Sequence, residues 1–270
     1  MKKDLHIHTN FSDGQYSPKE ILEKIQEKGI TEFAITDHDN FEGAIIMQNL
    51  VKNKNIKYHI GVEISSKIDD FNVHLLCYDF AIKNNSVNKL IEELKQKRLK
   101  KLDLMIDFVK KQFNYAITKE EKEKLLRENN IVGKPHIYAL ISRKIEIEKE
   151  YFYAKMRELK TADTKAEARD VIRTFHSANG KVVLAHPKEI EEEYNKDSYE
   201  VISHLTKLGL DGLETKHSKH SKGDILRFQK YAKHFNLFET MGSDFHGEKV
   251  KPNVKLGVCE KVEKNAENIL

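Results

Sequence analysis

The sequence of 270 residues predicts an α/β fold with a mostly parallel sheet. Short apolar runs alternate with longer amphipathic stretches, an order that is typical of parallel strands covered by helices. Polar residues, many of them histidines, stand within or directly after the apolar runs. Hydrophobic residues make up 39% of the chain and charged residues 33%, a balance that is typical of a soluble globular domain and too apolar for a disordered chain.

The composition excludes several classes of protein. No run approaches the roughly 20 apolar residues needed to cross a bilayer, and Asp4 and His6 interrupt the segment where a signal peptide would have its apolar core. Two cysteines, Cys77 and Cys259, exclude a disulfide scaffold and a four-cysteine zinc site. We therefore expect a cytoplasmic protein without membrane attachment. The net charge of +4 does not by itself indicate a nucleic-acid-binding protein.

Seven apolar runs are predicted to be strands, at residues 3–8, 32–36, 57–64, 72–78, 182–185, 212–214 and 237–240. Among the helices between them, residues 18–28 follow the cap residue Ser17 and precede Gly29, and residues 199–208 precede Gly209. About seven strands suit a barrel better than an open two-layer sheet, although the pattern alone does not close a barrel.

The middle of the chain differs from both ends. Residues 84–173 are rich in Lys and Glu and helical in pattern, with no convincing strand, and residues 90–112 carry apolar side chains between the charges. We expect residues 1–83 and 174–270 to form one α/β domain, and residues 84–173 to form a small helical insertion. The alternative is that these helices simply cover the sheet.

Residues with metal-binding side chains follow the predicted strands. His6 and His8 alternate along a strand and so point to one face, which makes them half of a site for a divalent metal. Asp13 follows them in a loop. Further clusters lie at TDHDN (36–40), GVEI (61–64), NVHLL (72–76), AHP (185–187) and GSDFH (242–246). Each cluster alone has an ordinary explanation, since a lone histidine such as His74 in an apolar strand is more often a packed core residue.

The coincidence of six clusters is more informative than any one of them. Active sites of barrel enzymes are built at the C-terminal ends of the strands, and histidine with carboxylate favours zinc, manganese or iron. The candidate ligands exceed the needs of one ion, so we expect two or three metals. Neighbouring metals can share a hydroxide nucleophile and stabilise both the attacking and the leaving oxygen, an arrangement that hydrolyses phosphate esters.

The motifs DLHIHTNFSDG, TDHD, GVEIS, NVHLL, LAHP and GSDFH, in this order between residues 4 and 246, resemble those of the polymerase-and-histidinol-phosphatase (PHP) family. The resemblance implies a distorted (β/α)7 barrel with a trinuclear centre of zinc, manganese or iron. It assigns His6, His8, Glu63 and Asp244 to the first metal, Glu63, His74 and His186 to the second, and Asp13, His38 and His246 to the third. Histidinol phosphatases usually have a histidine at the position of Asp13, so the third site is expected to be looser.

The insertion, with its Gly-Lys-Pro-His segment, resembles the branch of 3′,5′-nucleoside bisphosphatases and 5′→3′ exoribonucleases. The resemblance implies that His136 contacts a substrate phosphate, that Lys134 stands where relatives often carry Arg, and that Arg143 is a weaker phosphate contact. His220 falls where relatives carry a Ser-His-Ser segment, which implies a contact to a second phosphate. The alternatives are a polar residue at a helix N-terminus for His136 and a solvated loop around His220.

We therefore expect a metal-dependent phosphoesterase that uses a metal-bound hydroxide to hydrolyse 3′,5′-nucleoside bisphosphates or short 5′-phosphorylated RNA. The alternative enzyme is a histidinol-phosphate phosphatase, against which the insertion and Asp13 argue. Two other classes are a nuclease module that works beside a polymerase and a metal-binding protein without catalysis. The expected partner is a small phosphorylated substrate, and no obligate protein partner is inferred.

Overall fold

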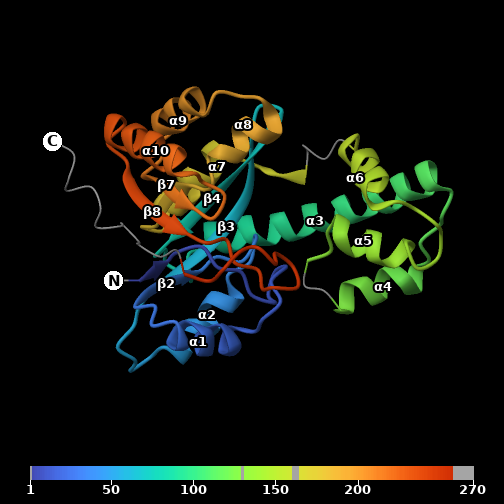
Figure 1. The fold of residues 1–270 in the computed structure, drawn as a ribbon, viewed down its shortest axis with the longest axis horizontal. Helices are drawn as coiled ribbons and strands as arrows, with labels where there is room; N and C mark the ends of the chain where they lie inside the picture. Colours follow the sequence, from blue (N-terminus) through green and yellow to red (C-terminus); the bar gives the residue numbers. More distant parts are fainter. Residues whose placement is uncertain (1, 129–130, 160–163, 258–270) are drawn as a thin grey trace.

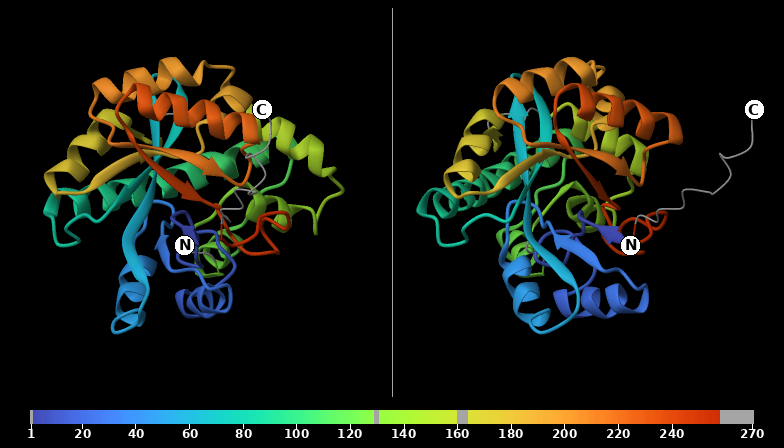
Figure 2. Two further views of the ribbon diagram at one scale, coloured as in Figure 1. Left: turned by 60° about the vertical axis from the view of Figure 1, so that its left-hand side comes forward. Right: turned by 90° about the vertical axis from the view of Figure 1, so that its left-hand side faces the viewer.

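The computed structural model describes residues 2–128, 131–159 and 164–257, so Cys259 and the end of the expected second barrel segment lie outside the described residues. Seven strands follow one another around a curved sheet (Figures 1 and 2). In this order they are β1 (Lys3–Asp4), β2 (Glu32–Ile35), β3 (Lys57–Ile68), β4 (Phe71–Tyr78), β6 (Lys181–Leu184), β7 (Gly212–His217) and β8 (Phe238–Gly242).

Backbone contacts between the first and last strands nearly close the barrel. The amide of Leu5 donates to the carbonyl of Met241 at 2.9 Å, and that of His8 donates to Phe245 at 2.9 Å. The expected strand over residues 3–8 is shorter in the structure, where only Lys3 and Asp4 form a regular ladder. The reason is that the residues after Asp4 alternate between two neighbours, since the carbonyl of Ile7 accepts from Thr36 while Ile7 also bridges to Phe245.

One strand runs against its neighbours. β4 is antiparallel to both β3 and β6, whereas β1, β2 and β3 are parallel to one another, as are β6, β7 and β8. The sheet is therefore mostly parallel, as expected, but β4 ends at the opposite end of the barrel from its neighbours. Tyr78, its last residue, donates from its hydroxyl to the carbonyl of Leu5, and Asp79 contacts His59 near the start of β3.

Helices cover the outside of the barrel (Figure 1). α1 (Pro18–Glu27) and α2 (Glu42–Leu50) lie beside β2, and the other side is covered by α7 (Ala168–Ser177), α8 (Lys188–Tyr194), α9 (Ser198–Lys207) and α10 (Lys222–His234). α1 begins as the sequence predicts: Ser17 and Glu20 form a reciprocal capping box, and Pro18 occupies the first helical position. Among the described helices, none is long and apolar enough to span a membrane.

The helical middle segment carries a core of its own. It contains α3 (Asn85–Phe113), α4 (Lys119–Glu128), α5 (Lys134–Ile141) and α6 (Lys149–Arg157), which extend to one side of the barrel (Figure 1). The first half of α3 packs Val87 and Leu94 into the barrel core, while the second half packs Met105 into a separate core with Ile137 and Phe152. The division of the chain at residues 84 and 173 stays a prediction. Residues 129–130 and 160–163 of this middle segment lie outside the described residues.

The expectation that this segment holds no strand is wrong in one detail. β5 (Ala166–Glu167) pairs in parallel with Ser66 and Lys67 of β3. It forms because β3 continues past the predicted end at Ile64 to Ile68, which leaves a stretch of strand edge for the returning chain to pair with.

Candidate metal centre

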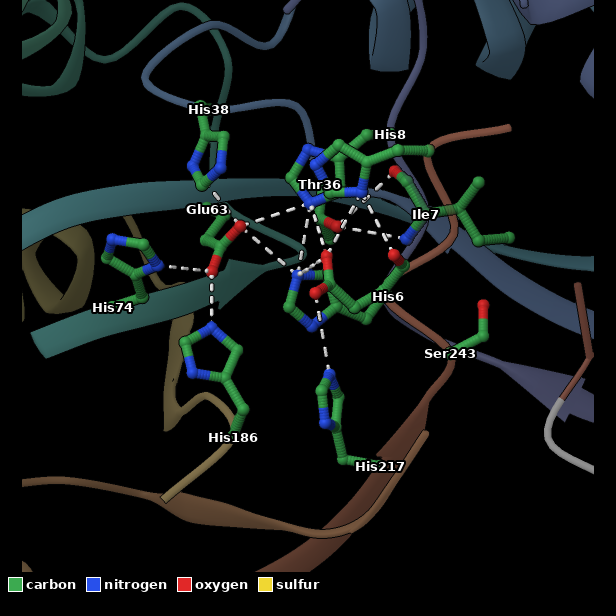
Figure 3. A network of polar contacts seen from close by, with 12 residues as sticks. His6, Ile7, His8, Thr36, His38, Glu63, His74, His186, His217 and Ser243 are labelled. Carbon is green, nitrogen blue, oxygen red and sulfur yellow. Dashed lines mark hydrogen bonds and ion pairs between the residues drawn. The ribbon is translucent and has the colours of Figure 1, made fainter. Parts of the chain in front are cut away.

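The predicted metal ligands meet at one end of the barrel. His6 and His8 follow β1, His38 follows β2, Glu63 lies in β3 and His74 in β4. His186 follows β6, and Asp244 and His246 follow β8. Figure 3 shows Glu63 surrounded by His6, His8, His38, His74 and His186, whereas the labelled His217 is not joined to it. The antiparallel β4 contributes His74 from its first half, because its start, and not its end, lies at this edge of the sheet.

Glu63 is the centre of the arrangement. Its side chain is 1% exposed. Its Oε2 atom lies 3.1 Å from Nε2 of both His6 and His8 and 3.2 Å from Nδ1 of His38. Its Oε1 atom lies 3.0 Å from Nδ1 of His74 and 3.0 Å from Nε2 of His186. The two oxygens therefore face two different groups of histidines, as expected for a carboxylate that bridges two cations.

The group around Oε2 fits a divalent metal. Nε2 of His6 and Nε2 of His8 lie 3.1 Å apart, and Oδ1 of Asp244 lies 3.6 and 3.4 Å from them. A single hydrogen cannot join two imidazole nitrogens and two carboxylate oxygens at these distances, whereas one cation can coordinate all four. In addition, Nδ1 of His38 is buried without a hydrogen-bond partner within the described part of the chain.

The third predicted group is more open. Oδ1 of Asp13 lies 3.3 Å from Nε2 of His246 and 3.6 Å from Nδ1 of His8, and its Oδ2 lies 3.9 Å from Nε2 of His38. The Asp13 side chain is 32% exposed, whereas that of Glu63 is almost fully buried. The structure thus brings the three residues of this group together, with longer separations than in the group around Glu63.

Charge interactions within the centre shift its pKa values in opposite directions. Burial alone would raise the pKa of Glu63, but the facing histidines, His38 and His6 above all, hold it well below its usual range. Burial and the neighbouring His246 lower the pKa of His8 to about 4. Neutral imidazoles and charged carboxylates are the forms that bind metals.

Two further aspartates form hydrogen bonds that hold the loops with the predicted metal ligands in place. Asp37 accepts hydrogen bonds from the amide and hydroxyl of Thr9 at 2.7 and 2.6 Å and from Ser12 at 2.7 Å. Asp4 accepts from the amide and hydroxyl of Ser243 at 2.8 and 2.6 Å. Burial raises the pKa of both aspartates to about 6. These contacts tie the loop after β1 to those after β2 and β8.

Close packing explains one glycine of the GSDFH motif. A Cβ atom at Gly242 would lie 2.2 Å from Cβ of His6 and 2.6 Å from Oε1 of Glu214. Any other residue would therefore displace a predicted ligand. Asp244, two residues further on, has a φ of +58°, a left-handed conformation that turns its carboxylate back toward the histidines.

Two residues outside the predicted site lie beside it. Glu214 and His217 on β7 are both buried. Nε2 of His217 lies 3.6 Å from Oδ2 of Asp244, and Lys251 reaches the same oxygen at 2.5 Å. Oδ2 of Asp244 is thereby occupied, while Oδ1 faces His6 and His8. The position of Glu214 at the end of an apolar run is the signal that also identified Glu63, so the sequence pattern could have included it.

Of the four predicted substrate contacts, Lys134 and His136 both lie in the first turn of α5. His136 is half-buried in the first turn of α5, where its Nδ1 accepts from the amide of Gly133 at 3.0 Å. Burial lowers its pKa, and the charge of Asp13 acts in the opposite direction. Arg143 is exposed on the turn after α5. His220 is buried, donates from Nδ1 to the carbonyl of Thr215 at 3.0 Å, and has a pKa lowered by burial to about 4.

A group of cationic side chains lies where the barrel meets α3 and α5. Arg98 of α3 donates to Oδ2 of Asp39, the residue after His38, from Nε at 2.7 Å. Burial and the charges of Arg98 and Lys134 lower the pKa of Lys101 to about 8. Burial and the charge of Lys101 lower that of Lys165 to about 7. Sequence patterns did not identify this group, because Lys165 and Asp39 are distant along the chain from Arg98 and Lys101 of α3.

Comparison with known proteins identifies one family. The model of the PHP domain matches residues 4–237. A phosphoribosyl 1,2-cyclic phosphate 1,2-diphosphodiesterase from Eggerthella lenta is 27% identical over 266 residues, which cover 92% of this chain and 95% of that protein. A 5′-3′ exoribonuclease from Haemophilus influenzae is 27% identical over 252 residues, which cover 91% and 90% of the two chains.

A solved structure has the same fold. It is that of a "putative metal-dependent phosphoesterase" from Bifidobacterium adolescentis, which superimposes with a TM-score of 0.79 at 27% sequence identity and covers 94% of this chain and 90% of its own.

Proposed function

The chain belongs to the PHP domain family and is a metal-dependent phosphoesterase, and from this premise we propose that it hydrolyses phosphate esters of nucleotides, either 3′,5′-nucleoside bisphosphates or short 5′-phosphorylated RNA. The observation that carries the proposal is Glu63, whose two oxygens face different groups of histidines at 3.0–3.2 Å. Paired cation sites of this kind suit in-line displacement at phosphorus.

The residues of the three groups are proposed to hold two or three ions of manganese, zinc or iron, which supply, when bound, the Lewis acidity that activates water and neutralises charge on the phosphoryl group. The chain's own part is positioning and charge. Glu63 and Asp244 offset the cations, and Asp37 and Asp4 hold the ligand-bearing loops in place. Lys251 contacts Asp244 from a side chain that is 32% exposed, so its charge lies where a substrate phosphate can reach it.

The cations at the junction with the insertion favour a substrate with more than one negative group. Arg98 is neutralised by Asp39, but among the described residues no carboxylate forms an ion pair with Lys101, Lys134 or Lys165. Lys101 is partly buried and is repelled by the charge of Lys134, and Lys165 is in turn repelled by that of Lys101. A second phosphate or an RNA backbone phosphate would relieve that repulsion.

A second candidate is the hydrolysis of a cyclic phosphodiester, the activity for which the Eggerthella lenta relative is named. The two candidates differ in the bond that is cleaved. The reacting phosphorus is part of a monoester in the bisphosphate and of a diester in RNA and in the cyclic compound, so the products formed distinguish these substrates.

The test measures hydrolysis, with added Mn²⁺, of adenosine 3′,5′-bisphosphate, AMP, a cyclic ribose phosphate, a short 5′-phosphorylated RNA and histidinol phosphate. The product is inorganic phosphate from the monoesters, nucleoside 5′-monophosphate from the RNA and the ring-opened monoester from the cyclic ester. We expect the highest kcat/KM with the bisphosphate or the RNA. Highest activity with the cyclic ester would favour the second candidate. Highest activity with histidinol phosphate, or none with any compound, would contradict the proposal.

The cationic group is tested separately by Lys101→Gln, with Lys100→Gln as the control because Lys100 is its exposed neighbour on the same helix. Lys101→Gln is expected to raise KM for the bisphosphate by roughly 10-fold, the effect of one charged hydrogen bond, and to leave KM for AMP nearly unchanged. Equal effects on both substrates would show that Lys101 does not contact the second phosphate.

A further inference from the structure

Glu214 connects two groups of predicted metal ligands through its two carboxylate oxygens. Oε1 lies 3.1 Å from Nδ1 of His6, a ligand of the first group. Oε2 accepts a hydrogen bond from the backbone amide of His186, a ligand of the second group, at 2.8 Å. We propose that Glu214 is a positioning residue that fixes His6 and His186 together and so makes the two sites bind metal as one unit. The inference rests on the metal centre of the proposed function.

The contact with His6 determines which ring nitrogen is free to bind a metal. A charged carboxylate only accepts hydrogen bonds, so Nδ1 of His6 must carry the hydrogen. In the neutral ring the lone pair is then on Nε2, the atom that faces Glu63 and His8 at 3.1 Å. A carboxylate behind a histidine ligand is a recurrent device that orients the ring and strengthens the ligand. Without Glu214, His6 could place its hydrogen on Nε2 and lose its metal-binding form.

The contact with His186 fixes the backbone of the second group. His186 has a φ of +28°, a conformation that non-glycine residues rarely adopt and that must be held by its surroundings. The hydrogen bond from its amide to Glu214 provides such a restraint. Its ring is held at both nitrogens, by Glu189 at 3.1 Å from Nδ1 and by Glu63 at 3.0 Å from Nε2.

Glu214 is buried, so solvent does not compete for its two contacts. The residue is 0% exposed. Gly242 packs so closely against it that a Cβ atom at position 242 would lie only 2.6 Å from Oε1. Both contacts are therefore made out of reach of bulk solvent. The alternative, that Glu214 and His217 hold a further metal with His6, requires Nδ1 of His6 to be a ligand, although its Nε2 already faces Glu63 and His8.

The first variant is Glu214→Gln in the full chain. A glutamine has one oxygen for two donors, so its amide group must face either His6 or the His186 amide, both of which are N–H donors. Titration of the metal-free protein with Mn²⁺ should show affinity lower by about 10- to 100-fold at both sites. The visible absorption of bound Co²⁺, which reports ligand geometry, should also change.

The matched control is Glu32→Gln, since Glu32 is a buried carboxylate at the other end of the barrel with several cationic partners. Both variants should lower the melting temperature of the metal-free protein, but only Glu214→Gln should lose the rise in melting temperature that Mn²⁺ produces. If Glu214→Gln does not fold, Glu214→Asp keeps the charge but is one methylene too short to reach both partners. It should bind two ions in separate steps where the wild type binds them together.

The inference is wrong if either folded Glu214 variant binds Mn²⁺ with the same affinity, stoichiometry and number of binding steps as the wild type. Failure of the wild type to bind two ions would overturn it together with the metal centre. Metal binding that behaves as described, with no hydrolysis of any of the substrates, would refute the proposed activity and leave the role of Glu214 intact.

Discussion

The two ends of the barrel hold buried carboxylates in different surroundings. At the end where β2 and β3 begin, Glu32 contacts Lys3 at 2.7 Å, Lys57 at 2.9 Å and His59 at 3.0 Å. At the other end, Glu63 contacts five histidines and, among the described residues, no lysine or arginine. Both carboxylates are less than a tenth exposed.

The difference indicates which end is suited to a cation from outside the chain. The lysines neutralise Glu32 permanently, because they stay protonated at neutral pH. Histidines can remain neutral, and burial lowers the pKa of His8 to about 4. Lys251 contacts Asp244, and against the effect of burial Glu189 and Glu63 raise the pKa of His186 to about 10. Part of the negative charge at this end is therefore offset by protons on histidine, which bound divalent ions would replace.

The largest expected effect comes from removing the charge of Glu63. Glu63→Gln should lose metal from both groups and lower kcat/KM by more than about 100-fold, since even residues behind the ligands contribute 10- to 100-fold. Asp244→Asn should disturb mainly the first group, and the double variant should be little worse than Glu63→Gln because the ligands act as a unit. Elemental analysis beside phosphate release measures this, with at least two ions expected in the wild type.

Glu32→Gln serves as the control for this prediction, because it removes a buried carboxylate without touching the metal centre. Full metal content and a near-normal rate in Glu63→Gln would show that the bridging role is wrong and that the two ends of the barrel are more alike than their contacts indicate.

Removal of the metals should destabilise one end of the barrel selectively. An ion present at 100 times its Kd stabilises the folded state by about 2.7 kcal/mol. A chelator should therefore lower the melting temperature of the wild type and change that of Glu63→Gln little. Calorimetry of both proteins with and without the chelator tests this, and an equal shift in the two would mean that the ions stabilise some other part of the chain.

His136→Ala tests whether the phosphate-binding region extends from the barrel into the insertion. A charged contact to phosphate contributes about 1.5–3 kcal/mol, so kcat/KM should fall by roughly 10- to 150-fold while metal content stays unchanged. Arg143→Ala, on the exposed turn after the same helix, should have a smaller effect. Unchanged kinetics in His136→Ala would leave the residue with only its contact to the Gly133 amide.

The smallest expected effect is the pH dependence at the opposite end. The neighbouring Lys3, Lys57 and His59 lower the pKa of Glu32 to about 2 against the burial that would raise it. A carboxylate with a lowered pKa contributes stability above its unfolded value near 4.5, and this contribution is lost as the pH falls toward 2. The difference in unfolding free energy between wild type and Glu32→Gln should be about 1–2 kcal/mol at pH 7.

Denaturant unfolding between pH 7 and pH 2 measures that difference. It should stay constant down to about pH 4.5 and shrink below it. A difference that grows on acidification would show that the lysines do not hold Glu32 in its charged form.

Local patterns predicted much of the site. Alternation within a strand placed His6 and His8 on one face, and the ends of apolar runs identified Glu63 and Asp244. These signals work because a ligand at a strand end is determined by a few neighbouring residues. The capped helix α1 was predictable for the same reason.

Features that depend on distant segments were not predictable. The reversed direction of β4 depends on pairing with β3 and β6, and the two residues of β5 depend on a free edge of β3. Glu214 carries the same local signal as Glu63, but its partners are 208 and 28 residues away. Patterns in one chain locate candidate side chains and do not say which of them face one another.

The reversed direction of β4 also determines at which end of the barrel the helical insertion begins. Because β4 ends near His59, α3 starts at the end of the barrel that contains Glu32. Its 29 residues span about 43 Å. The length of a helix fixes the direction in which the chain leaves it as well as the distance it covers, since each residue adds about 100° of rotation about the axis. One residue added between Arg98 and Leu102 would swing α5 about the helix axis, whereas four would nearly restore its phase and move it about 6 Å further out. Related chains that keep this activity should therefore change the length of α3 by whole turns.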